Sequence, residues 1–493
     1  MIPMRITLIW ICLLARLAFY AAMLPLWEGV DEWAHFAVVQ SVELRGEWLA
    51  SRDRPIPRNI EASLRIVPIP WELRHFDPPS VTHDAYWQLP ESEQRRRTEA
   101  LGAIPREWAL EDGSGVFSNY EAQQPPLYYW LVAPLVWLIP SRSLAIQVLA
   151  VRCLSALVAS MAVPLVYRIG RGLFEGEGMA LGGAAVIAVM PGFAGIAARV
   201  GNDALAAPVY AALLLAGLVL WRRPSLRVAC QTALALTLGL LTKAYFLTAV
   251  PAVVWLLWRR GYLRAALIPL FLAGWWYVLS AVTGGSLLTS GTMTGLSFSP
   301  AAVLGNVPSV PWFRAVDAAL FSHIYCGGWS WLTVRSWIYH VFYFVLAAAA
   351  IGLWRWLLKP GILWVLAVYL SFWAGELWHA ALMFAARGVP ASMGYYLYGV
   401  VAAEVPLCVA GLSTWLRRWA APLGAAMFAL LDLATMHLLA LPYYAGAIRH
   451  QADGVVHFAR FSAMVRPHSP ALVALWICYL LATLAVVPLA AKK

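Results

Sequence analysis

Charged residues are scarce in this 493-residue sequence. Asp, Glu, Lys and Arg make up 12% of it, and 61% of the residues are hydrophobic. In a soluble domain about 25% of the residues are charged and about 45–50% are apolar. A soluble globular protein is therefore excluded. The net charge of +11 is no argument for nucleic-acid binding, because the basic residues form short clusters between apolar runs. The 26 Trp and 20 Tyr suit the interfacial aromatic belts of a polytopic membrane protein.

Paired cysteines and a cleavage site are also missing. The six cysteines are scattered and include no Cys-x-x-Cys pair, so neither a disulfide framework nor a zinc site is indicated. No small-residue cleavage site follows the first apolar run, residues 6–24. We therefore expect that run to be a retained helix and not a removed signal peptide.

Apolar runs of about 17–25 residues predict about twelve transmembrane helices. They cover residues 6–24, 144–167, 178–196, 204–221, 228–242, 244–258, 265–282, 337–353, 361–383, 395–414, 421–440 and 471–489. A shorter aromatic run between Pro125 and Pro140 predicts an interfacial helix. The expected fold class is an all-α polytopic membrane protein, with residues 1–493 as a single membrane domain. Its external loops would be 25–143, with juxtamembrane helices, then 283–336 and 441–470.

The distribution of Lys and Arg orients the predicted helices. If the N-terminus is cytoplasmic, every short loop after an even-numbered helix lies inside, and each carries at least two basic residues. We therefore predict an integral protein of the bacterial inner (plasma) membrane. Both termini would be cytoplasmic, and the long loops would lie on the outer side.

The most unusual stretch, Trp27-Glu28-Gly29-Val30-Asp31-Glu32-Trp33-Ala34-His35-Phe36, directly follows the first predicted helix. It places three carboxylates and an imidazole within eight residues. Charges this close to hydrocarbon are costly unless they face water, a partner or a ligand. Asp31 and His35 are four residues apart, so a helix would bring them to one face. The alternative is that Asp31 caps this helix and Glu32 is a favourable helix-start charge.

Other polar features fall on the same predicted outer face. They are Glu121 and Gln124 before the interfacial helix, Asn202-Asp203 at a helix start, Lys243 at a helix end, and the loop 327–331 with two Trp. Amides and carboxylates suit hydroxyl groups, a lysine suits phosphate, and indoles suit sugar rings. Helix caps, a snorkelling lysine and an aromatic belt are the structural alternatives. Together the features suit a substrate with a polar head and a lipid tail.

These motifs resemble the GT-C glycosyltransferases, in particular the protein O-mannosyltransferases and the related family-39-like bacterial proteins. The stretch Asp31 to Phe36 is similar to their Asp-Glu…His-Phe signature, and Glu121 to Tyr129 is similar to their loop-to-helix motif. Further motifs follow in the family's order, at Arg152, Asn202-Asp203, Leu241-Thr242-Lys243 and Gly274-Trp275-Trp276. Two motifs depart from the family: Gly394-Tyr395-Tyr396 lacks the Arg of Gly-Arg-Tyr, and Val278-Leu279 replaces Arg-Asn.

The resemblance implies transfer of a sugar from a polyprenyl-phosphate donor to an acceptor lipid, glycan or protein, as in cell-envelope glycan biosynthesis. We expect Asp31, or Glu32 beside it, to be the general base, with inversion at the anomeric carbon. Lys243 and Arg199 would stabilise the leaving phosphate. The expected substrate-binding residues are His35, Glu121, Gln124, Arg199, Asn202, Asp203 and Lys243. The resemblance implies no nucleotide sugar, no cofactor and, for the mannosyltransferase branch, no obligatory metal, although Asp31 and Asp203 together would also suit a divalent cation.

Two other functional classes stay open. A flippase for lipid-linked saccharides would need polar residues at mid-membrane depth, and few ionisable residues lie inside the predicted spans. These include Arg16, Arg152, Glu376, His379, Glu404 and Asp432. A polysaccharide polymerase or ligase would use external Arg and His. The loop 442–470 contains such residues: Arg449, His450, His457, Arg460, Arg466 and His468.

Overall fold

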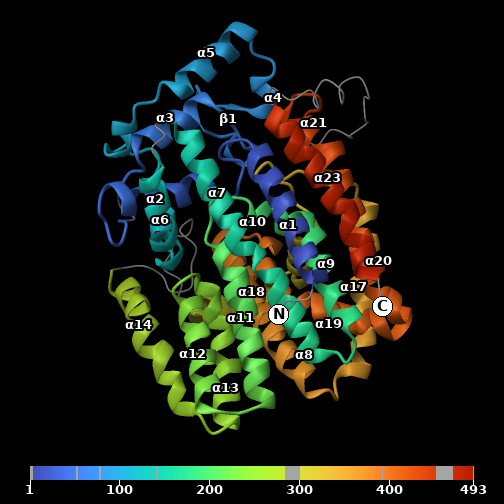
Figure 1. Cartoon of the computed structure of the whole chain (residues 1–493). Helices are drawn as coiled ribbons and strands as arrows, with labels where there is room; N and C mark the ends of the chain where they lie inside the picture. Colours follow the sequence, from blue (N-terminus) through green and yellow to red (C-terminus); the bar gives the residue numbers. More distant parts are fainter. Residues whose placement is uncertain are drawn as a thin grey trace.

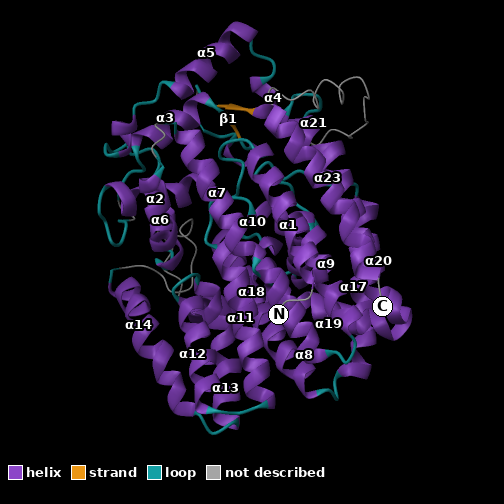
Figure 2. Ribbon diagram, viewed as in Figure 1, coloured by secondary structure: helices purple, strands orange, loops and turns teal. Residues whose placement is uncertain are grey.

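The computed structural model describes residues 4–51, 54–76, 79–139, 143–283, 300–390, 392–450 and 470–491. In this part of the chain nearly all regular structure is helical, and Figure 2 shows one small sheet. Its two strands, β1 (Pro68–Ile69) and β2 (Val81–Thr82), pair in parallel. The all-α polytopic fold class is confirmed.

The helical bundle follows the apolar runs of the sequence. Its helices are α1 (Met4–Met23), α7 (Leu144–Ser160), α8 (Ala162–Leu173), α9 (Glu177–Val189), α10 (Pro191–Ala197), α11 (Asp203–Arg222), α12 (Leu226–Leu240), α13 (Val250–Arg259), α14 (Leu267–Val282), α17 (Ser336–Gly352), α18 (Pro360–Arg387), α19 (Val401–Leu416), α20 (Ala420–Thr435) and α23 (Pro470–Ala491). A shared core of buried Ala, Val, Leu and aromatic side chains runs through the bundle.

All twelve predicted ranges overlap a helical segment of the structure. Among the described residues, eight helical segments are long and apolar enough to cross a membrane, or nine if one bent pair is counted as a span. Three of the twelve ranges lie in shorter or joined segments. These are α12, the stretch 244–259 and the second half of a continuous segment, 394–444. The count of twelve spans stays a prediction.

The bent pair positions part of the site. Helices α9 and α10 meet at 64° across Met190. Pro191 opens α10, and a proline has no backbone N–H with which to continue the preceding helix. Arg199 to Asp203 therefore lie in the short connection from α10 to the start of α11.

The segment between α1 and α7 folds over one end of the bundle, at the top of Figure 1. It contains α2 (Glu32–Leu44), α3 (Arg58–Ile66), α4 (His83–Tyr86), α5 (Glu91–Gly102) and α6 (Leu127–Leu138), with 3-10 turns η1 (Trp71–Leu73), η2 (Arg106–Ala109) and η3 (Tyr120–Gln123). A second core, which includes Trp27, Trp33, Phe36 and Tyr129, packs α2 and α6 against α7. The short α6 corresponds to the predicted interfacial helix.

The long predicted loops contain more helix than expected. Within 283–336 lie α15 (Pro300–Asn306), η7 (Val307–Ser309) and α16 (Trp312–Ile324). The remaining short elements are η4 (Ala244–Ala249), η5 (Leu263–Ala266), η8 (Leu353–Trp356), η9 (Gly394–Val400), η10 (Arg417–Trp419), the π-helical turn η11 (Met436–Ala440) and α21 (Leu441–Tyr444). His457, Arg460, Arg466 and His468 of the third predicted loop lie outside the described residues.

Candidate active site

A cavity of about 1920 Å³, part of it open solvent, lies where the external segment meets the bundle. Its wall contains most of the site residues predicted from the sequence: Asp31, His35, Glu121, Gln124, Arg199, Asp203 and Lys243. Another part of the wall is largely apolar and is formed by η4, α14 and α18, with Leu247, Trp276, Phe372 and Met383. The cavity thus combines a polar end with an apolar groove.

Asp31 faces the cavity and does not act as a helix cap. It is the residue before α2, yet its side chain makes no capping hydrogen bond. Its backbone is left-handed, with φ at 55°, a conformation that costs a non-glycine residue roughly 1–3 kcal/mol and is concentrated at functional sites. Tyr120 Oη donates a 2.6 Å hydrogen bond to Asp31 Oδ1. Burial raises the pKa of Asp31, although the Tyr120 hydrogen bond opposes this shift.

Glu32 lies away from the cavity in a buried ion pair. Arg152 of α7 binds it with two nitrogens, Nε at 2.7 Å and Nη2 at 2.5 Å, and the Val200 N–H donates a third hydrogen bond at 3.0 Å. Arg152 also donates to the carbonyls of Ala21, Leu24 and Pro25. These carbonyls lie at the end of α1, where the helix itself supplies no N–H partners. Arg152 and Glu32 therefore fix the chain on both sides of the loop that carries Asp31.

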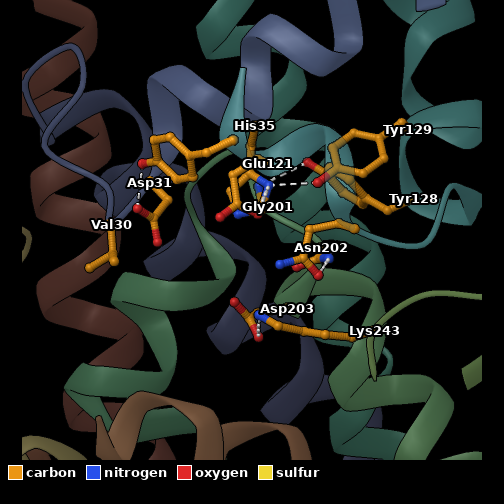
Figure 3. Close-up of polar contacts among 12 residues, drawn as sticks. Val30, Asp31, His35, Glu121, Tyr128, Tyr129, Gly201, Asn202, Asp203 and Lys243 are labelled. Carbon is orange, nitrogen blue, oxygen red and sulfur yellow. Dashed lines mark hydrogen bonds and ion pairs between the residues drawn. The ribbon is translucent and has the colours of Figure 1, made fainter. Parts of the chain in front are cut away.

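His35 and Glu121 form a second polar pair beside Asp31 (Figure 3). His35 Nδ1 lies 2.8 Å from Tyr129 Oη and 3.6 Å from Glu121 Oε2. Burial lowers the pKa of His35 well below its usual value, so the imidazole is neutral near pH 7. Burial, together with the nearby Asp31 carboxylate, raises the pKa of Glu121 to about 8. Glu121 is therefore mainly a protonated carboxyl group at neutral pH.

Lys243, Asp203 and Arg199 form a chain of charges on the bundle side of the site. Lys243 Nζ lies 2.6 Å from Asp203 Oδ1, and Arg199 Nη2 lies 2.7 Å from Asp203 Oδ2. Arg199 also donates to the carbonyl of Val30, the residue before Asp31. Two buried cations thus share a single carboxylate. This arrangement retains a positive charge that is available to an anionic ligand.

Asn202 joins the segments that carry these groups, but it does not line the cavity. Its Nδ2 donates to Gln124 Oε1 at 3.2 Å and to the Thr242 carbonyl at 3.1 Å. The connection links η3, the start of α11 and the end of α12. Asn202 therefore sets the relative positions of Glu121, Asp203 and Lys243, which lie in those three segments.

The loop 327–331 closes part of the cavity with Trp329 and Trp331. Glu28 holds this loop, because its carboxylate accepts hydrogen bonds from Ser330 N at 2.8 Å and Ser330 Oγ at 3.0 Å. His450 Nε2 donates to the Ser330 carbonyl at 2.7 Å, and its ring stacks on Trp71. Glu28 and His450 therefore both bind Ser330, the residue between Trp329 and Trp331, and hold the two indoles at the cavity.

Asp203, one of the two carboxylates that the sequence suggests for a divalent cation, contacts two cations of the protein itself. Within the described part of the chain, no group of three or more His, Cys, Asp or Glu side chains could hold a metal ion. Both oxygens of Asp203, the carboxylate that the sequence pairs with Asp31 for a divalent cation, already contact Lys243 and Arg199. A cation between Asp31 and Asp203 would therefore have to displace these ion pairs.

Several wall residues could not be singled out from their types alone. Tyr120 holds Asp31, and Tyr395 and Tyr396 face the cations. Arg199 lies over the Tyr395 ring at 5.4 Å, and Lys243 Nζ lies 5.4 Å from the centroid of Tyr396. Both tyrosines belong to the motif in which relatives often carry Gly-Arg-Tyr. The presence of Tyr395 where relatives often carry Arg was the one signal in the sequence that this part of the wall differs from theirs.

Residues 123–283 match the family model described as dolichyl-phosphate-mannose-protein mannosyltransferase. This family match confirms the resemblance. It covers Gln124, Arg199, Asn202, Asp203 and Lys243, while Asp31 and Glu121 precede it. It also supports membrane glycosyltransferase activity as the general class of function.

Solved structures give a weaker likeness over almost the whole chain. ArnT from Cupriavidus metallidurans, bound to undecaprenyl phosphate, is 15% identical, with a TM-score of 0.48, over 98% of this chain and 74% of that one. The oligosaccharyltransferase AglB from Archaeoglobus fulgidus, in complex with an inhibitory peptide and a dolichol-phosphate, is 11% identical, with a TM-score of 0.46. That match covers 98% of this chain and 56% of the archaeal chain. A search of curated proteins finds no significant match.

Proposed function

We propose that the protein is an inverting glycosyltransferase. It moves a sugar from a polyprenyl phosphate to an acceptor hydroxyl at the outer face of the membrane that contains it. The observation that carries this proposal is the position of Asp31. Its carboxylate is unused as a helix cap and lines the same cavity as the cations Lys243 and Arg199. A base and a phosphate-binding pair in one cavity are what this transfer requires.

Asp31 is the proposed general base. An acceptor hydroxyl is a poor nucleophile until its proton is removed. Burial raises the pKa of Asp31 above that of an ordinary aspartate, which makes the carboxylate a better proton acceptor at neutral pH. The hydrogen bond from Tyr120 keeps the carboxylate in one orientation. As the oxygen–C1 bond forms, Asp31 takes the hydroxyl proton.

Lys243 and Arg199 are the proposed phosphate-binding groups. When the bond from C1 to the phosphate oxygen breaks, its electron pair leaves with the polyprenyl phosphate. Positive groups already in place stabilise that developing charge without reorganisation. Asp203 holds both cations, so its role is to position them. The part of the apolar groove formed by η4 and α14, with Leu247 and Trp276, would take the polyprenyl chain.

The other predicted residues have supporting roles in this proposal. Glu32 is a positioning residue, because Arg152 occupies both of its oxygens and it lies off the cavity wall. His35, Glu121 and Gln124 would contact substrate hydroxyls from the cavity wall. The acceptor is a lipid, glycan or protein, and we place the reaction at the outer side of a bacterial inner membrane, with both termini cytoplasmic.

The test measures release of polyprenyl phosphate by the purified protein in lipid nanodiscs, with a panel of polyprenyl-phosphate sugars. Asp31→Asn should lower turnover by about 10²–10⁴-fold, because it removes the base, without lowering the temperature of thermal unfolding. The matched control is Glu32→Gln, which should lower the unfolding temperature because it weakens the pairing of the buried Arg152.

Two outcomes would contradict the proposal. Wild-type turnover in Asp31→Asn would remove Asp31 as the base. Binding of the sugar lipids across the whole panel with no turnover by the wild-type protein would favour a transporter. A loss of activity in Glu32→Gln at unchanged thermal stability would instead move the base to Glu32.

A further inference from the structure

A second polar cluster lies on the α18 wall of the cavity that also contains the proposed phosphate-binding cations. Glu376 and His379 are one helical turn apart, and both line the cavity. Ser392, which is buried and lies off the cavity wall, joins them. Its Oγ donates a 2.5 Å hydrogen bond to Glu376 Oε1 and lies 2.9 Å from His379 Nδ1.

The directions of these hydrogen bonds fix the chemistry of the imidazole. The Ser392 hydroxyl has one hydrogen, and Glu376 receives it, so His379 Nδ1 is the donor to Ser392 Oγ. A neutral His379 then has an unprotonated Nε2, which is an acceptor. No described residue makes a hydrogen bond to this Nε2 or an ion pair with Glu376. The cluster therefore presents hydrogen-bond acceptors to the cavity.

Two other histidines of the bundle differ in this respect. His437 has a partner on each nitrogen, the Leu433 carbonyl at 2.8 Å and Trp476 Nε1 at 2.9 Å. His323 likewise contacts the Gly394 carbonyl and Glu404. A histidine that only joins helices is satisfied on both sides. His379 is satisfied on one side and open to the cavity on the other.

The position of the cluster indicates which part of a substrate it would meet. Lys243 Nζ lies 5.4 Å from the centroid of the Tyr396 ring, and the His379 ring lies 5.8 Å from the same centroid, edge-on to it. The proposed phosphate-binding cation and His379 of α18 therefore contact the same tyrosine ring. All three groups line one cavity, so a group attached directly to a phosphate at Lys243 would lie near this cluster.

The geometry points to Glu376 and His379 as the subsite for the hydroxyl groups of the donor sugar, with Ser392 as their positioning residue. Sugar hydroxyls donate hydrogen bonds, and the cluster offers acceptors. A site built to bind a hydroxyl rejects an analogue that lacks it, because its buried polar groups are then left unpaired. This subsite would therefore select among donor sugars. The inference rests on the proposed polyprenyl-phosphate donor.

The experiment compares binding of two lipids, a polyprenyl phosphate that carries a hexose and the same polyprenyl phosphate without sugar. Glu376→Gln should weaken binding of the sugar-bearing lipid by about 5- to 10-fold, because an amide oxygen is a weaker hydrogen-bond acceptor than a carboxylate, and leave the sugar-free lipid unchanged. His379→Phe, which keeps a ring beside Tyr396, should act in the same direction. Ser392→Ala should reproduce a smaller part of the selective loss.

The contrary results are distinct. If Glu376→Gln and His379→Phe weaken both lipids equally, or neither, the cluster only joins α18 to the segment before η9 and the subsite is overturned. The second variant also keeps the test decisive if the first fails to fold. Binding needs no turnover, so a wild-type protein that binds the sugar lipid selectively but transfers nothing would contradict the proposed function and leave the subsite standing.

Discussion

Two regions of this protein bury charged side chains, and they differ in how completely the charges are satisfied. In the bundle, Asp432 of α20 pairs with Arg16 of α1 at 2.8 Å and accepts hydrogen bonds from Tyr20 and Tyr479. Arg16 also donates to Thr483. At the candidate active site, by contrast, buried atoms of Glu121, Arg199 and Asn202 have no hydrogen-bond partner in the described structure.

The difference separates architecture from function. A buried ion pair with every hydrogen bond satisfied holds elements together, here α1, α20 and α23, and leaves no group for a ligand. The site network has the same residue types, but it borders a cavity and retains unpaired polar atoms. Buried polar groups normally have partners, so the unpaired atoms of Glu121 and Arg199, two residues that line the cavity, are available to a ligand.

The largest expected effect comes from disruption of the satisfied network around Arg16 and Asp432. Asp432→Asn leaves Arg16 without its counter-charge in the interior, which should cost about 3–5 kcal/mol of stability. We expect a much lower unfolding temperature in detergent and little folded protein in the membrane. Thermal unfolding followed by tryptophan fluorescence, together with the yield of monodisperse protein, measures this.

The double variant Arg16→Met with Asp432→Leu is the control. Replacement of a buried ion pair by apolar groups is often neutral, so the double variant should recover most of the stability and retain transfer activity. A folded double variant without activity would contradict a purely architectural role for this pair.

A smaller effect is expected at the network of the candidate active site. Lys243→Ala should weaken donor binding by about 10- to 100-fold, the cost of a lost charged hydrogen bond of about 1.5–3 kcal/mol, with little change in unfolding temperature. Asp203 keeps Arg199 as its partner in this variant, so the native state loses less than in Asp432→Asn. Steady-state kinetics with each substrate varied in turn should show a rise in the donor KM and a nearly constant acceptor KM.

Lys243→Arg is the matched control, because it keeps the positive charge and should restore part of the donor affinity. An unchanged donor KM in Lys243→Ala would contradict the phosphate contact and would reduce the contrast between the two networks.

The sequence could predict the helices and the members of the site because both depend on local patterns. Length and hydropathy located the helical ranges. The order of the motifs and the distribution of basic residues predicted that Asp31, Glu121, Asp203 and Lys243 lie at one end of the bundle. In the structure these four residues line one cavity.

The division of labour among those residues depends on contacts that are distant in the sequence. Asp31 and Glu32 are adjacent and chemically alike, and only the pairing of Glu32 with Arg152, 120 residues away, separates them. Glu376 and His379 lie inside an apolar run, where the sequence offered no means to tell a cavity wall from a helix contact. The left-handed backbone of Asp31 likewise follows from its surroundings and not from its residue type.

The smallest expected effect concerns the charge state of Glu121 and sharpens the comparison further. The pKa of Glu121 is about 8, so its carboxyl group is protonated at neutral pH and ionises as the pH rises through that value. Ionisation would add a negative charge beside Asp31 and the proposed phosphate site, so kcat/KM for the donor should fall several-fold above about pH 8. Glu121→Gln stays neutral at every pH and should lose this decline.

Because the folded pKa lies above the usual glutamate value, the protonated form also stabilises the native state, and that contribution decreases as the pH rises toward 8. A pH profile of kcat/KM, together with unfolding temperatures between pH 6 and pH 9 for both proteins, checks the two effects; identical profiles would show that Glu121 does not change charge in the site.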